Sequence, residues 1–413
     1  MSTNSRPRAP SDFRYWLNAA RPSARAARAL SRRVLGVDAA PPDNVVTEFA
    51  AGYFEGDPLA DALVAAATSP KAARAALERA VGRASTEDAA DQAATALLAE
   101  LDEPPSWLDP VLLERGAGVF RRYGSSIFRF AGAITLFGYS ESSVAKPLAL
   151  TGAYTGSTAR RRFLETVAFW IAVSEPGGMS RGAEGFRTAL RVRVLHAEIR
   201  RRLLAHPEWR LEDWGVPINQ SDALLTLLGG SFIPGVAMHV LGYRVSRADI
   251  EASMHFWRYV GHVMGVRPAS FPTTFADAAQ LVFVALLKRA GGAGEDGVKL
   301  CRDYARAFRP DESTSASAWE RLRARLDHHM HLGMTRLFLP AHTYAQNGLP
   351  EAGLWALAPM LRFPVNALSS IAAGRSERAR ELADRLARKE RAAWYARRSN
   401  QTARFEPVEQ MSR

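Results

Sequence analysis

Apolar side chains recur every three or four residues through most of the chain, whereas the strict alternation typical of strands is scarce. This spacing predicts an all-α protein. The stretch "RVRVLHAEIRRRLL" and the residues just before it are predicted to form a helix with one apolar stripe. The stripe consists of Ala189, Val192, His196, Ile199 and Leu203, and the arginines lie on the other faces of the helix. The stripe directs the His196 imidazole toward the core, where it either has an ordinary hydrogen-bond partner or binds a ligand.

Changes in composition divide the chain into four consecutive ranges. We expect a basic, poorly ordered N-terminus over 1–40, an Ala-rich helical extension over 41–104, the main helical domain over 105–345 and a helical tail over 346–413. Most aromatic, histidine and glycine residues lie in the main domain, so we expect function to reside there. The tail contains a charged helix with a thin apolar seam of Leu382, Leu386 and Ala393, which predicts packing on the surface.

The bulk composition is that of a globular protein, since 47% of the 413 residues are hydrophobic and 23% are charged. Such a chain can bury a large core. The formal net charge is +12, but the arginines are spread along the whole length among many alanines, so we expect no nucleic-acid partner. The single cysteine, Cys301, excludes an intrachain disulfide framework and any CxxC motif.

No segment reads as a secretion signal or a convincing membrane span. The basic N-terminus has no apolar core of the kind that signal peptides carry. The longest uncharged run, between Asp222 and Arg244, is interrupted by Gly229, Gly230, Ser231 and Pro234. We therefore predict two buried helical pieces joined by a turn, and a cytoplasmic protein. A peripheral contact of the basic tail with anionic lipid stays open.

One predicted helix, "TARRRFLETVAFWIAV", combines polar groups on a single face. Arg162, Glu165, Thr166 and Phe169 are spaced so that a cation, a carboxylate and a hydroxyl lie together beside an aromatic ring. On an exposed helix this would be a solvated ion pair of small energetic weight. Beside a cavity it could hold an anion and exchange a proton. The following turn over 174–185 would let this helix pack antiparallel to the one that carries His196.

Other candidate sites are weaker. Glu251, His255 and His262 could form a metal site, although Arg258 lies in the middle of the same face and would repel a dication. The cluster "HHMH" over 328–331 resembles a metal site in composition, yet adjacent histidines on a helix point in different directions. The sequence contains no GxGxxG after a strand, no Walker loop, no GxSxG elbow and no HExxH. Any chemistry would therefore depend on a bound cofactor.

Four stretches together, "RRRFLETVAFW", "RVRVLHAEIRRRLL", "WGVPINQSD" and "HFWRYVGHVMGV", resemble the bacterial latex-clearing protein (rubber oxygenase) family and the group that includes a fungal endoplasmic-reticulum-bound oxygenase. The resemblance covers roughly Arg115 to Met264. It implies an all-α fold, a haem b pocket between helices of the main domain, and oxidative cleavage of isoprenoid double bonds with dioxygen. It makes His196 the iron ligand, Arg162 a haem-pocket arginine and Thr166 a pocket threonine.

The chain departs from that family at two positions. Lys146 stands where the rubber oxygenases carry an acidic residue proposed as a base, and Glu165 stands where they carry a lysine. We hypothesise that Glu165, or else Lys146, handles a proton if one must move. Without a secretion signal, we expect an intracellular isoprenoid or lipid rather than solid rubber as the substrate. Two alternatives remain: a non-catalytic haem or lipid-binding protein, and a metal-dependent hydrolase built on Glu251, His255 and His262.

Overall fold

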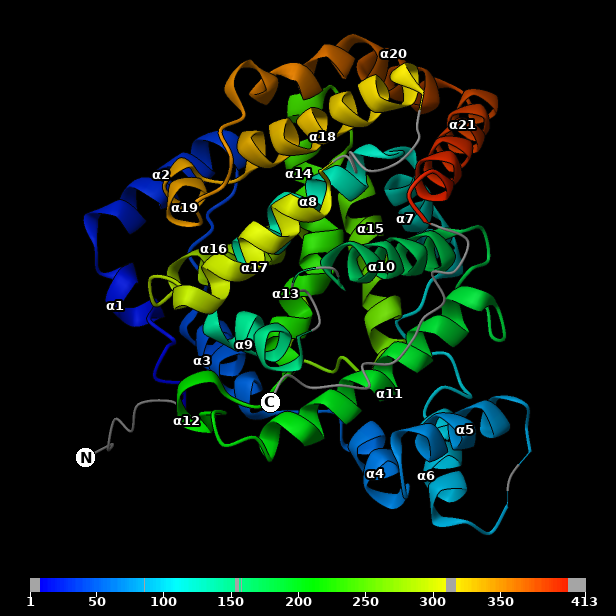
Figure 1. Ribbon diagram of the computed structural model, residues 1–413. Coiled ribbons are helices and arrows are strands. Elements are labelled where there is room, and N and C mark those ends of the chain that lie inside the picture. Colours follow the sequence, from blue (N-terminus) through cyan, green and yellow to red (C-terminus); the bar gives the residue numbers. More distant parts are fainter. Residues whose placement is uncertain (1–7, 85, 153–155, 157, 310–316, 400–413) are drawn as a thin grey trace. The chain divides into compact units, whose positions relative to one another are not determined.

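The computed structural model describes residues 8–84, 86–152, 156, 158–309 and 317–399. Across these residues the regular structure is helical and no strand occurs (Figure 1). The expected all-α class is confirmed.

The helices follow one another along the chain with short connections. The first half comprises α1 (Tyr15–Ala19), α2 (Pro22–Leu35), α3 (Asp43–Ala51), η1 (Gly52–Phe54), α4 (Pro58–Ala66), α5 (Pro70–Val81), α6 (Ala89–Ala99), α7 (Pro110–Arg122), α8 (Ser126–Gly138), α9 (Ser142–Thr151) and α10 (Thr158–Ser174). The second half comprises α11 (Glu184–Leu204), α12 (Leu211–Trp214), α13 (Gln220–Gly230), α14 (Phe232–Ala237), η2 (Met238–Leu241), α15 (Arg247–Val263), α16 (Phe275–Leu287), α17 (Gly294–Ala307), α18 (Ala318–Phe338), α19 (Ala341–Gln346), η3 (Gly353–Ala356), η4 (Ala358–Arg362), α20 (Phe363–Arg375) and α21 (Glu377–Ala396).

The described residues group into two compact units, each discontinuous in sequence. The first draws on Met1–Ala117, Ala172–Leu228 and Glu251–Ala290, and the second on Gly118–Ile171, Gly229–Ile250 and Gly291–Arg413. The division into four consecutive ranges that we expect from the sequence remains a prediction. His196 belongs to the first unit, whereas Lys146, Arg162, Glu165 and Thr166 belong to the second.

In the first unit, α4, α5 and α6 pack against one another, and α4 also packs against α11. Figure 1 shows these three helices together in blue and cyan. Their starts are encoded locally, because the side chains of Asp57, Ser69 and Asp88 each accept a hydrogen bond from a backbone N–H of the first turn. Proline follows the cap in α4 and α5, where its missing N–H costs nothing.

The N-terminus differs from the poorly ordered segment expected over residues 1–40. Within its described part lie two helices, α1 and α2. The Asn18 side chain at the end of α1 donates to the carbonyls of Leu287 and Arg289, at 2.7 and 3.0 Å. Arg28 and Arg32 of α2 both pair with Asp38, which lies just beyond the end of the helix. The composition is basic, but these tertiary partners order it, which composition alone does not reveal.

The longest uncharged run folds as expected into two helical pieces. α13 ends at Gly230, and Ser231 leaves the helical region before α14 begins. At the start of α13, the side chain of Asn219 accepts from the Asp222 backbone N–H at 2.8 Å. By length and composition the joined stretch Gln220–Leu241 could cross a membrane, and half of its most apolar window is buried within the protein.

Aromatic rings fill the centre of the second unit. Phe163 of α10 lies edge-on to Tyr304, Phe308, His331 and Trp394, with ring centroids 5.1 to 6.4 Å apart. Such edge-to-face pairs add to the free energy gained from burial. α10, α17, α18 and α21 are thereby joined in one core.

The C-terminal charged helix, α21, packs through a different face than expected. Leu382 and Leu386 of the predicted seam are exposed, while Ala387, Arg391 and Trp394 are buried. The large Trp394 ring, which packs on Phe128, outweighs the two leucines in setting the buried face.

Candidate functional site

The His196 ring is deeply set in α11 and carries no hydrogen bond. Burial and the nearby charge of Arg200 lower the pKa of the imidazole to about 4, and the charge of Asp57 opposes them only in part. The imidazole is therefore neutral at pH 7. Part of the residue's surface is nevertheless accessible. Among the described residues, no group donates a hydrogen bond to the ring or accepts one from it.

The stripe expected from the sequence is only partly the buried face of α11. Val192, His196 and Ile199 are half-buried, whereas Arg193 and Arg200, expected on other faces, are buried. The core of the unit therefore receives two guanidinium groups from the helix that bears His196. Charged groups in such places require partners.

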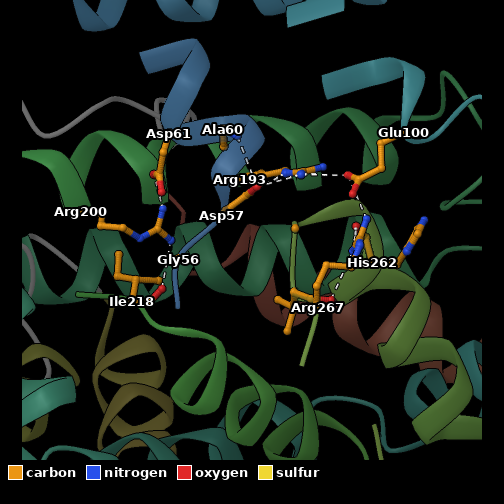
Figure 2. Close-up of polar contacts among 12 residues, drawn as sticks. Gly56, Asp57, Ala60, Asp61, Glu100, Arg193, Arg200, Ile218, His262 and Arg267 are labelled. Carbon is orange, nitrogen blue, oxygen red and sulfur yellow. Dashed lines mark hydrogen bonds and ion pairs between the residues drawn. The ribbon is translucent and has the colours of Figure 1, made fainter. Parts of the chain in front are cut away.

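Arg193 lies between two carboxylates, as Figure 2 shows. Its Nε and Nη2 donate to the two carboxylate oxygens of Asp57, at 2.6 and 2.9 Å, and Nη2 also contacts Glu100 at 3.0 Å. The forked guanidinium suits such a bidentate contact. Because Asp57 also caps α4, this one carboxylate ties the start of α4 to the middle of α11.

Arg200 makes a second tie two turns further along α11. It donates to Asp61 of α4 at 2.5 Å and to the backbone carbonyls of Pro217 and Ile218, at 3.1 and 3.0 Å. In Figure 2 the Arg193 and Arg200 side chains leave the same helix toward Asp57 and Asp61. His196 lies between the two ties in sequence, so they fix the helix segment that presents the imidazole.

The far side of Glu100 is held by Arg267, whose Nη2 lies 3.0 Å from the carboxylate. Arg267 also donates to the backbone carbonyl of His262, at 2.6 Å. Burial and three nearby arginines lower the pKa of His262 to about 4. The backbone at Gly265 packs closely against the Asp57–Arg193 ion pair. A side chain at this position, where φ is +77°, would collide with both residues. We refer to Asp57, Arg193, Glu100 and Arg267 as the buried clamp.

In the second unit, α10 brings together the polar residues expected on one of its faces. Arg162 Nη1 donates to Glu165 Oε2 at 2.7 Å, and the Thr166 hydroxyl donates to the Arg162 carbonyl at 3.0 Å. Arg162 and Glu165 are buried. The pair is therefore a buried ion pair and not the solvated one that was the alternative.

Lys146 lies on α9, a helix with an internal proline, and its Nζ is 2.6 Å from the carboxylate of Asp296 at the start of α17. α9 and α17 pack against each other. The ammonium group therefore joins these two helices, whereas Glu165 is joined to Arg162.

The metal site drawn from Glu251, His255 and His262 does not form. His255 Nε2 accepts the Asp109 backbone N–H at 3.0 Å, and Glu251 accepts that of Phe275 at 2.9 Å. Within the described ranges, no three or more His, Cys, Asp or Glu residues lie so that they could hold a metal ion.

The "HHMH" cluster points its rings in different directions, as expected. His331 is buried, stacks on Phe308 and lies 3.1 Å from the Tyr304 hydroxyl. His329 stacks on Trp355. The cluster therefore serves packing between helices.

The buried clamp and the Arg200–Asp61 ion pair were not predicted from the sequence. One signal was present: Asp57 and Asp61 are one helical turn apart, and Arg193 and Arg200 are two turns apart on one face. The spacing alone does not predict that α4 packs against α11, because these two helices are far apart in sequence.

Three comparisons with known proteins agree. A solved structure of latex clearing protein LCP in the closed state superposes with a TM-score of 0.53 and 18% identity, covering 77% of this chain and 91% of that one, which shows the fold alone. A rubber oxygenase from Streptomyces sp. (strain K30) is 29% identical over 180 residues, 42% of this chain and 43% of that protein, so the match spans less than half of its length. Residues 120–373, more than half of the chain, match the family described as "ER-bound oxygenase mpaB/B'/Rubber oxygenase, catalytic domain". The chain belongs to this family of oxygenases.

Proposed function

We propose that the protein is a haem b oxygenase that uses dioxygen on an apolar, unsaturated substrate of the isoprenoid or lipid class. The observation that carries the proposal is the His196 imidazole: neutral, deeply set, accessible in part, and without a hydrogen bond among the described residues. Membership of an oxygenase family supports the reaction class.

In this proposal the His196 imidazole would hold the haem iron. An imidazole must be deprotonated to bind a metal, and burial keeps this one neutral over the physiological pH range. The ties made by Arg193 and Arg200 hold the helix and so orient the ring, which lowers the entropic cost of binding. When bound, haem would supply the redox chemistry with dioxygen.

Arg162, Glu165 and Thr166 are proposed as reaction residues on the strength of the family resemblance. The arginine stabilises negative charge on the Glu165 carboxylate at 2.7 Å, and the threonine hydroxyl is fixed by the Arg162 carbonyl. In this proposal Glu165 accepts a proton from the substrate, and Arg162 holds the carboxylate in place. Lys146 is the second candidate for handling a proton.

An absorption spectrum of the purified protein tests the cofactor. We expect a haem Soret band that is lost in His196→Ala and retained in His206→Ala, a histidine just beyond the end of α11 whose ring accepts a backbone N–H. Circular dichroism checks that both variants fold. A colourless protein that does not take up added haem would refute the proposal. A Soret band without oxygen consumption on polyisoprene or short isoprenoids would favour the non-catalytic alternative.

Exchange of Glu165 for glutamine tests the proton acceptor. The amide keeps an oxygen for Arg162 but cannot take up a proton, so we expect kcat to fall by about 100-fold or more with an unchanged Soret band. Glu165→Asp, which keeps a carboxylate, should recover part of the rate. If Glu165→Gln turns over as fast as the wild type while Lys146→Met is slow, the role passes to Lys146.

A further inference from the structure

An apolar ribbon of the second unit faces solvent. It comprises η3, η4 and α20, residues 353–375, and its exposed fractions are 88% for Leu354, 60% for Leu357, 81% for Leu361, 65% for Val365 and 69% for Leu368. Met360 and Ile371 are exposed as well. Single exposed leucines are ordinary, but seven large exposed apolar side chains within eighteen residues are a concentration of the kind that marks an interaction surface.

The ribbon is anchored by its inner side. Trp355 stacks on His329 with 4.8 Å between ring centroids, and Pro359 is buried. A side chain at Gly333 of α18 would collide with the Trp355 carbonyl, which shows how closely η3 approaches α18. On α20, the Asn366 amide donates to the Leu241 carbonyl at 2.8 Å. These contacts hold the backbone, so the leucines project from a fixed base and are not a frayed segment.

The outward face of α20 is set by helical spacing. Leu361, Val365 and Leu368 are one helical turn apart, whereas Asn366 and Ala373 occupy the opposite, buried side. The pattern is thus inverted relative to an ordinary surface helix, whose large apolar residues face inward. Nothing in the described part of the chain covers them.

The charges of the ribbon favour one kind of occupant. Between Ala352 and Ser376 the sequence contains two arginines and no acidic residue. Arg362 is paired with Glu390 of α21, at 2.9 Å, so Arg375 is the arginine of the ribbon that the described residues leave exposed. Arg375 is exposed, and the chain as a whole carries a net charge of +12. Large apolar side chains with a basic fringe suit a membrane surface that contains anionic lipid. A second copy of the ribbon would instead bring like charges together.

We propose that the 353–375 ribbon is a docking surface for an anionic phospholipid bilayer. The exposed leucines insert among the acyl chains at the boundary with the headgroups, and Arg375 contacts the lipid phosphates. This attachment is peripheral and needs no membrane-spanning segment. It is independent of the haem proposal, since it uses neither His196 nor the residues of α10.

Vesicle sedimentation of the full chain tests the proposal. We expect binding to phosphatidylcholine vesicles with phosphatidylserine, much weaker binding to pure phosphatidylcholine, and a loss of about tenfold or more in affinity for the variant Leu354→Ser, Leu361→Ser, Leu368→Ser. The matched control changes three isolated exposed residues, Val111→Ser, Leu204→Ser and Leu286→Ser, and should bind like the wild type.

A second measurement does not depend on removing apolar surface. A polarity-sensitive fluorophore on Leu361→Cys should shift to shorter wavelength when anionic vesicles are added, and one on Val111→Cys should not; the native Cys301 is buried and should react poorly with the dye. Three results would overturn the proposal. The first is that the ribbon variant binds anionic vesicles with wild-type affinity. The second is that the wild type binds neutral and anionic vesicles equally well. The third is that the ribbon variant changes self-association without lipid and leaves vesicle binding unchanged.

Discussion

Replacing Arg193 with alanine is expected to lower the free energy of unfolding by about 3–5 kcal/mol. Arg193 is 2% exposed and lies between Asp57 and Glu100. Its removal leaves the buried Asp57 carboxylate without its arginine partner, whereas Glu100 keeps its contact with Arg267. The same change loosens the helix that carries His196, so the haem binding proposed above should weaken together with stability. Urea unfolding followed by circular dichroism measures the first effect, and the ratio of Soret to protein absorbance measures the second.

Arg191 provides the matched control two residues away. It pairs with Glu78 and Glu184 on the exposed side of α11. Exposed ion pairs contribute little, so Arg191→Ala should change the free energy of unfolding by less than about 1 kcal/mol. Equal losses in the two variants would mean that general loss of charge, and not the buried clamp, sets the stability of this helix.

Stability is also expected to fall steeply between pH 6.5 and 4, because histidines are buried in neutral form. Burial, assisted by Arg129 and Arg398 and opposed by Asp327, lowers the pKa of His331 to about 3. The pKa of the unfolded residue is about 6.5, so below that pH the unfolded state takes up a proton that the folded state refuses. The contribution of His331 is complete above pH 6.5 and is lost as the pH falls, on the order of 3 kcal/mol by pH 4.

The slope of stability against pH is the readout. In His331→Phe the free energy of unfolding should depend less on pH, by roughly 1 kcal/mol per pH unit over this window, whatever the change at pH 7. His342→Gln, at an exposed position, should keep the wild-type slope. Asp327, whose pKa lies at about 2 because Arg129 and Arg398 outweigh burial, adds its own loss only below about pH 4. An unchanged slope in His331→Phe would contradict the assignment.

Helical periodicity predicted the fold class, because it depends on neighbours in sequence. The cap at Asn219 and the capping box of Ser246 and Asp249 are equally local, since each joins residues three apart. Packing that depends on distant residues was not predictable in the same way. The seam of α21 was assigned to Leu382 and Leu386 because leucines dominate a local pattern, but Trp394 has a partner in Phe128, from another part of the chain.

In the candidate site, too, local arrangements were predictable from the sequence and contacts between distant residues were not. The side-by-side placement of Arg162, Glu165 and Thr166 follows from helix geometry and was predicted. The burial of Arg193 and Arg200 was not, since an arginine beside an apolar stripe reads as solvated until its carboxylate partner is known. The metal site at Glu251 and His255 failed for a related reason: backbone N–H groups of distant segments occupy both side chains.

The reach of the buried clamp along the chain has a consequence for synthesis. The carboxylate of Asp57 and the guanidinium of Arg193 are separated by 136 residues. At ribosomal rates of about 5–20 residues per second, the acidic partner waits roughly 7–30 s before the basic one is made. During that interval α4 can be capped and helical but cannot close its part of the core. The first unit can therefore complete its core only late in translation. A nascent chain stalled before α11 would expose the unpaired carboxylates of α4 to chaperones and proteases.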